Sequence, residues 1–177
     1  MNCTADNVLT FCQNILEIKE FPAYRLYPIG NKHKKVNSKI ILPENAQFSE
    51  ISKEISAVVD DTTRTLSAAN INMFVKDIIE TRFPGVVLFY DQEEVNLSFR
   101  VLAQLKRYSS HIMFGKLKNP PEELKNKYRI EKTPTLVSIF FKDPTNTKLS
   151  FDENLQIGTH PGSLSFSDIR HFLETVK

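Results

Sequence analysis

The feature that most constrains this fold is a short run, residues 84–91 with the sequence PGVVLFYD, in which a turn signal opens an uncharged, apolar stretch. Its length and its β-favouring residues indicate a strand rather than a helix. A strand that is apolar at every position has to be buried on both faces, so other elements must cover the sheet on either side. Amphipathic helical patterns precede and follow the run. The sequence therefore predicts an α/β fold with helices on both faces of a central sheet.

The chain from about residue 68 onward continues this alternation of helical and strand patterns. Residues 111–117, 134–143 and 148–157 are typical of strands, and residues 120–130 predict a short helix. The predicted order is α-β-α-β-α-β-β-α, with one long helix after the apolar run. Three helical stripes support this order: Ile71, Phe74, Val75, Ile78 and Ile79, then Leu97, Val101, Leu102, Leu105 and Tyr108, and last Leu164, Ile169, Phe172, Leu173 and Val176.

A shorter series of elements precedes the polar segment at residues 60–65, DDTTRT. Residues 7–18 predict a helix, residues 21–30 and 38–42 predict strands, and a helix starts near Phe48. This order, α-β-β-α, repeats the last four elements of the second series. It is an internal repeat in which the front half of the first copy is missing.

Both copies enter a strand through a proline, in EFPAYRLYP (residues 20–28) and in KTPTLVSIFF (residues 132–141). With this element order, the chain resembles the thioredoxin superfamily and, within it, the protein disulfide isomerase type. The resemblance implies a thioredoxin-like fold with a central mixed sheet. It implies a complete domain at residues 66–177 and the C-terminal half of another at residues 1–65. Pro134 would be the cis-proline of this fold, and Pro22 its counterpart in the first copy.

The dithiol of that family has no counterpart in the second copy. Aligning VLFYD with the strand before the active-site helix puts the two cysteines at Glu94 and Leu97, and the buried acid of the family at Leu88. Disulfide exchange needs a thiolate at the helix N-terminus and a second cysteine to resolve the mixed disulfide. We therefore expect a redox-inactive module and assign no catalytic residue. The acids at residues 91–94 are explained by the preference of helix N-termini for negative charge.

The proline step offers a second kind of site. In thioredoxin-like proteins the backbone edge beside the cis-proline pairs with extended peptides, and losing the cysteines leaves that edge in place. The candidate peptide-binding residues are Thr133, Pro134 and the surfaces of Phe89 and Tyr90, with Pro22 as the equivalent proline. The alternative, a proline kept only for folding, stays open.

The sequence holds two cysteines, Cys3 and Cys12, whose spacing fits neither a redox C-x-x-C pair nor a zinc site. They either form a disulfide that closes a short loop or are two small buried thiols, and the sequence leaves both open. By resemblance, they take the places of two cysteines in the back half of a disulfide isomerase catalytic module. An oxidising compartment would favour the disulfide.

Several partner classes are disfavoured. The formal net charge of +2 and a single basic cluster in a polar turn, residues 32–39, do not indicate a nucleic-acid partner. No apolar run approaches the length of a membrane span. We assign no metal or cofactor, because the histidines are scattered. No signal peptide or retention signal is recognisable. The endoplasmic reticulum lumen follows from the resemblance alone.

Three functions fit these patterns. The first is a non-catalytic region of a disulfide isomerase-like multi-domain protein, which binds unfolded clients as a chaperone or spaces catalytic modules. The second is a part of a thiol-disulfide oxidoreductase whose dithiol lies upstream of Met1. The third is a structural or adaptor domain of a co-chaperone or sulfhydryl oxidase-like protein. Whether the parent is an enzyme stays open. Because a half-module leaves a sheet edge unpaired, we expect the chain to belong to a longer protein.

Overall fold

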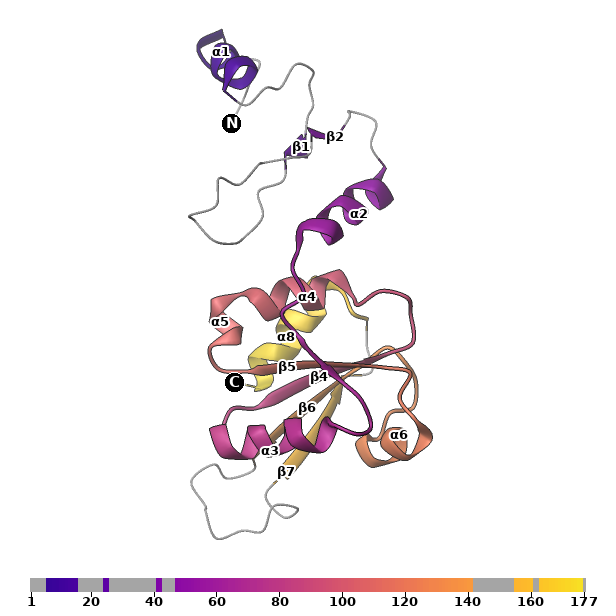
Figure 1. Ribbon diagram of the computed structural model, residues 1–177. Coiled ribbons are helices and arrows are strands. Elements are labelled where there is room, and N and C mark those ends of the chain that lie inside the picture. Colours follow the sequence, from indigo (N-terminus) through magenta and orange to yellow (C-terminus); the bar gives the residue numbers. More distant parts are fainter. Residues whose placement is uncertain are drawn as a thin grey trace. The chain divides into compact units, whose positions relative to one another are not determined.

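The computed structural model describes residues 6–15, 24–25, 41–42, 47–141, 155–160 and 163–176. The chain divides into two compact units, Met1–Asp60 and Asp61–Lys177, and each is described by itself. Figure 1 shows the helices and strands of both units.

The first unit contains α1 (Asp6–Asn14), β1 (Tyr24–Arg25), β2 (Ile41–Leu42) and α2 (Phe48–Val58). The two short strands pair antiparallel, with Tyr24 opposite Leu42. At the start of α2 the backbone N–H of Gln47 donates to Glu50 Oε2 at 2.9 Å, so the glutamate caps the helix that follows Gln47. The observed order α-β-β-α is the one that the sequence pattern predicts. That this unit is half of a thioredoxin-like domain stays a prediction.

The second unit is built around a five-stranded sheet of order β3-β5-β4-β6-β7. Strand β5 is parallel to both β3 and β4, whereas β6 runs antiparallel to β4 and β7 antiparallel to β6. The mixed sheet expected from the sequence is therefore present. Its elements are β3 (Arg64–Leu66), α3 (Ile71–Thr81), β4 (Gly85–Tyr90), α4 (Leu97–Gln104), α5 (Lys106–Ser109), β5 (Met113–Lys118), α6 (Glu122–Tyr128), β6 (Thr135–Phe141), β7 (Leu155–His160) and α8 (Phe166–Val176).

Strand β4 lies in the middle of this sheet, and all six of its residues are buried. Because side chains alternate along a strand, Val87 and Phe89 pack with α3 and α6 on one face. Val86, Leu88 and Tyr90 pack with α4, α5 and α8 on the other. Figure 1 shows the same three layers, with α3 and α6 on one side of the sheet and α4, α5 and α8 on the opposite side.

Gly85 lets α3 approach β4 closely. A Cβ atom at this position would lie 2.2 Å from Ile78 Cδ1, which is far inside van der Waals contact. The glycine of the Pro-Gly signal is thus the first residue of the strand and has a packing role in addition to its place beside a turn.

The structure differs from the expected order in three places. Strand β3 lies at Arg64–Leu66, in a segment whose polar sequence predicts only a linker. The single helix expected from Leu97 to Tyr108 is divided, because Leu105 has an extended backbone (φ −66°, ψ 121°) and ends α4 before α5 begins. The last strand is found at Leu155–His160, later than the expected 148–157, and residues 148–154 lie outside the described residues.

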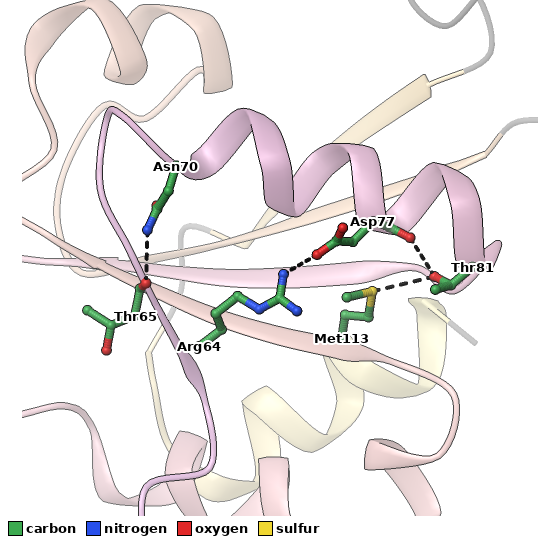
Figure 2. A network of polar contacts seen from close by, with 6 residues as sticks. All are labelled: Arg64, Thr65, Asn70, Asp77, Thr81 and Met113. Atoms are coloured by element: carbon green, nitrogen blue, oxygen red, sulfur yellow. Dashed lines mark hydrogen bonds and ion pairs between the residues drawn. The ribbon is translucent and has the colours of Figure 1, made fainter.

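A polar network fastens β3 to α3 (Figure 2). The Arg64 guanidinium pairs with the Asp77 carboxylate, and Asn70 Nδ2 donates to the backbone oxygen of Thr65 at 3.4 Å. Thr81 Oγ1 lies 2.7 Å from the Asp77 backbone oxygen and 3.5 Å from the sulfur of Met113 on β5. The contacts of Arg64 and Thr65 add to the backbone pairing with β5 in holding this three-residue strand at the sheet edge.

The second unit starts with an anchored residue, Asp61. Its Oδ1 accepts a hydrogen bond from the Thr63 backbone N–H at 3.0 Å, and its other oxygen pairs with the ammonium group of Lys116 on β5. The two side chains are only 22% and 14% exposed. Burial by itself raises the pKa of the Asp61 carboxyl, but the hydrogen bonds to Lys116 and Thr63 outweigh it and hold the pKa below its ordinary value.

Two buried tyrosines differ in how their hydroxyl groups are satisfied. Tyr108 donates to Glu174 Oε1 at 2.7 Å, and burial together with this carboxylate raises the pKa of the tyrosine. Tyr128 packs its ring 5.6 Å from that of Phe89, yet its buried hydroxyl has no hydrogen-bond partner among the described residues. A buried donor without a partner destabilises the fold.

We predict opposite effects of removing these two hydroxyl groups. Tyr128→Phe removes an unsatisfied donor and should raise the free energy of unfolding by about 1 kcal/mol, whereas Tyr108→Phe breaks a bond to a carboxylate and should lower it by about 1 kcal/mol. Urea unfolding of the two variants and the wild type measures both effects. Equal destabilisation by both substitutions would contradict this prediction.

We also predict that Asp61→Asn lowers the free energy of unfolding by about 1 kcal/mol at pH 7, because the ion pair with Lys116 is lost. A carboxyl whose pKa is lower in the folded state stabilises the fold above its unfolded pKa and stops doing so as the pH falls through the folded value. The difference between variant and wild type should therefore begin to shrink as the pH falls below the ordinary carboxyl pKa of 3.8, and should vanish only below the lower pKa of the folded state. Urea unfolding across this range checks the prediction, and a difference that persists in acid would refute it.

Candidate functional site

A pocket of about 460 Å³ lies at one end of the sheet, where three loops meet. They are the loop between β4 and α4, the loop before β6 and the loop before α8. We call it the Thr133 pocket, and six of its eight lining residues are polar. The lining residues are Gln92, Glu94, Asn96, Lys132, Thr133, Pro134, Ser163 and Leu164.

Asn96 connects two of these loops. Its Oδ1 accepts from the backbone N–H of Phe99 at 3.1 Å, which caps the first turn of α4. Its Nδ2 donates to the backbone oxygen of Leu164 at 3.3 Å. One side chain thus fixes both the start of α4 and the segment that leads into α8.

Thr133 connects the remaining loop. The Thr133–Pro134 peptide bond is cis. Thr133 Oγ1 donates to Asp91 Oδ2 at 2.7 Å, which joins the loop before β6 to the end of β4. Within the part of the chain that the structure describes, the backbone N–H and C=O of Thr133 have no hydrogen-bond partner. A donor and an acceptor of the main chain are therefore available beside the pocket.

The structure brings several of the residues named from the sequence together and separates others. Glu94, Thr133 and Pro134 line the same pocket, although Glu94 is distant from the other two in the sequence. Leu97 is the first residue of α4 and is not among the lining residues. Cys3 and Pro22 lie outside the described residues.

Phe89 and Tyr90 belong to the core instead of the pocket, which corrects the expectation that their surfaces contribute to a peptide site. Phe89 is 0% exposed and Tyr90 is 7% exposed. The reason is the position of β4, since helices cover both faces of the strand and its side chains reach no surface. The candidate site keeps Thr133 and Pro134 and loses the two aromatic residues.

Leu88, the position aligned with a buried acid, is fully buried between the sheet and α4 in an apolar cluster. The residue beside it in the sheet register is Lys116, whose ammonium group pairs with Asp61. The sequence contains no cysteine after Cys12. The pocket therefore has neither a thiol to attack a disulfide nor a carboxyl at this position to accept its proton.

Cys12 is 0% exposed and disulfide-bonded, so its thiol is not free. The pairing of Cys12 with Cys3 stays a prediction, because Cys3 lies outside the described residues. Cys12 lies on α1, where its neighbour Phe11 is exposed, as is Ile15 directly after the helix.

Several of the lining residues are not among the site residues expected from the sequence. Asn96 had a usable signal, because an asparagine directly before an apolar helical stripe is a favoured N-cap. No sequence signal marks the other four, because their position at one pocket depends on how three distant loops meet. These residues are Gln92, Lys132, Ser163 and Leu164. Among the described residues there is no cluster of metal-binding side chains, and no helix there is long and apolar enough to cross a membrane.

Comparison with solved structures identifies the fold. Residues covering 98% of the chain superimpose on 24% of the full-length ERdj5 crystal structure, with a TM-score of 0.62 and 15% identity. Two further crystal forms of ERdj5, form I and form II, match with TM-scores of 0.59 and 0.58 at the same identity. No protein-family model and no curated protein matches the sequence.

The five-stranded unit therefore has the thioredoxin-like fold that the resemblance implies. The whole chain spans about a quarter of the length of the ERdj5 chain that it matches. At 15% identity the similarity shows the fold alone.

We predict that Asn96 stabilises the site through its two hydrogen bonds. Asn96→Ala loses both and should lower the free energy of unfolding by about 1–2 kcal/mol. Asn96→Asp keeps the capping oxygen, loses the donor to Leu164 and should cost less. Gln92→Ala, at an exposed position of the same pocket, is the control that should leave stability unchanged. Urea unfolding compares the three, and an alanine variant as stable as the wild type would rule out this role.

Proposed function

We propose that this chain is a non-catalytic, thioredoxin-like region of a larger disulfide isomerase-like protein, and that the Thr133 pocket binds extended segments of unfolded polypeptide. The observation that carries the proposal is the unpaired backbone of Thr133 at the edge of a pocket. A main-chain donor and acceptor on one residue can pair with the backbone of an extended peptide, as in recognition by strand addition. Such pairing is independent of the peptide sequence, which suits the binding of diverse unfolded chains.

The chemistry of the pocket supports a binding role over a redox role. A carboxylate at Glu94 cannot attack a disulfide, because exchange requires a thiolate. The cluster around Leu88 is apolar, so it contains no carboxylate that could accept a proton from a thiol at the start of α4. The second unit therefore presents the shape of a thioredoxin-like site without the groups that would form a mixed disulfide.

Two observations support the proposal that the chain belongs to a larger protein and that this protein resides in an oxidising compartment. The fold matches about a quarter of the ERdj5 chain, which is consistent with one region among several. We propose that residues 1–65 are the C-terminal half of one thioredoxin-like domain and that residues 66–177 are a complete second one. The two compact units of the structure divide slightly earlier, after Asp60. The disulfide at Cys12 favours a compartment such as the endoplasmic reticulum lumen, where disulfides persist.

The alternative concerns the parent protein. The disulfide-bonded Cys12 on α1 agrees with the cysteine arrangement expected of a catalytic module, so the parent would be a thiol-disulfide oxidoreductase with its dithiol elsewhere. The proposed role of the Thr133 pocket is the same in either case. In such a parent the pocket would hold a client segment while a catalytic module acts on it.

We predict that the chain suppresses the aggregation of a reduced, unfolded protein and that filling the pocket abolishes this effect. Gln92→Trp places a large ring at an exposed lining position, whereas Glu93→Trp places the same ring at the exposed neighbouring residue outside the lining. Light scattering during refolding measures suppression. We expect loss with Gln92→Trp and retention with Glu93→Trp. Absence of suppression by the wild type would reject client binding and favour a structural or adaptor role.

The same preparation should show no turnover in an insulin-reduction assay, because the second unit contains no cysteine. Insulin reduction that is faster with the protein than with the dithiol reductant alone would overturn the non-catalytic assignment.

A further inference from the structure

The charged residues of the Thr133 pocket indicate which segments it selects. Two oppositely charged side chains, Glu94 and Lys132, line the pocket, and both are exposed. They come from different loops, Glu94 from the loop before α4 and Lys132 from the loop before β6. Within the described ranges, neither side chain forms an ion pair or a hydrogen bond.

Several other charged groups of the second unit have partners within the protein. Arg64 pairs with Asp77, Lys116 with Asp61, Arg107 with Glu174 and Lys125 with Glu122. The nearby carboxylate of Asp91 is occupied by the Thr133 hydroxyl group. Glu94 and Lys132 are thus charges within one pocket that the protein itself leaves available.

We propose that Glu94 and Lys132 make the Thr133 pocket selective for extended segments that carry charges of both signs, Glu94 binding a basic side chain and Lys132 an acidic one. This inference rests on the proposed function, since it assumes that a polypeptide occupies the pocket. In an extended segment successive side chains point to opposite sides, so neighbouring residues can reach groups on different loops. Of the eight lining residues, only Pro134 and Leu164 are apolar.

The polar lining also excludes a class of segment. An apolar side chain placed in this pocket would remove water from the carboxylate and the ammonium group without replacing their hydrogen bonds, which is unfavourable. Hydrophobic segments, the usual clients of holding chaperones, are therefore disfavoured. Selectivity comes from attraction to charged segments together with this penalty for apolar ones.

The test uses a flexible, neutral host peptide of Gly, Ser, Thr and Gln, with a single Arg, a single Glu, or both in either order at its central positions. Fluorescence anisotropy at low salt measures binding to the complete chain. For the wild type, we expect each favourable charge to tighten binding by about two- to five-fold, as exposed ion pairs do, and raised salt to remove this gain.

Two variants assign the effects to residues. Glu94→Gln should remove the gain from Arg and leave that from Glu, whereas Lys132→Gln should do the reverse, as in a double-mutant cycle. Glu93→Gln and Lys118→Gln, at exposed positions outside the lining, are matched controls that should change neither gain.

The outcomes separate the two proposals. If no peptide binds to the wild type, the proposed function fails. If the peptides bind but neutral and charged ones bind equally, or if both gains survive in Glu94→Gln and Lys132→Gln, only the selectivity is wrong.

Discussion

The second unit depends on the burial of β4 on both faces. All six residues of this strand are buried, and the five after Gly85 contribute alternately to the two apolar clusters that hold α3 and α6 on one face and α4 and α8 on the other. Because the strand is fixed from both sides, the point where it ends is fixed as well. The loop that follows carries Asp91, Gln92, Glu94 and Asn96, and each has a defined role or position at the pocket.

The pocket illustrates how a scaffold can be kept while its chemistry differs. Two side-chain hydrogen bonds, from Thr133 to Asp91 and from Asn96 to Leu164, hold three loops in the arrangement that forms it. None of these bonds involves a group that reacts. Under the proposed function, these bonds keep the pocket and the unpaired main chain of Thr133 in place with a carboxylate, Glu94, at the position where the resemblance implies a thiolate.

Particular residues show what could be predicted from the sequence. The periodicity of α3, the unbroken apolar run of β4 and the proline before β6 identify the architecture, because each reflects burial that the fold requires. Strand β3 was missed since Arg64–Leu66 is short, mostly exposed and held by side-chain contacts with α3. The break at Leu105 was missed because that residue fits the apolar stripe while its backbone is extended. Phe89 could have been excluded in advance, as a strand buried on both faces leaves no surface. The sequence does not indicate that Lys132, Ser163 and Glu94 line the same pocket, because that arrangement depends on tertiary packing alone.

The apolar environment of Leu88 has a consequence for how such a module could change over time. Cysteines introduced at 94 and 97 would restore a dithiol but not the buried acid beneath it. An acid at 88 would have to be placed in an apolar cluster, where an unpaired charge is costly, and the nearest ammonium group, on Lys116, is already engaged by Asp61. Under the proposed non-catalytic role, the packing of the core around Leu88 and the residues at positions 94 and 97 would therefore both oppose disulfide exchange.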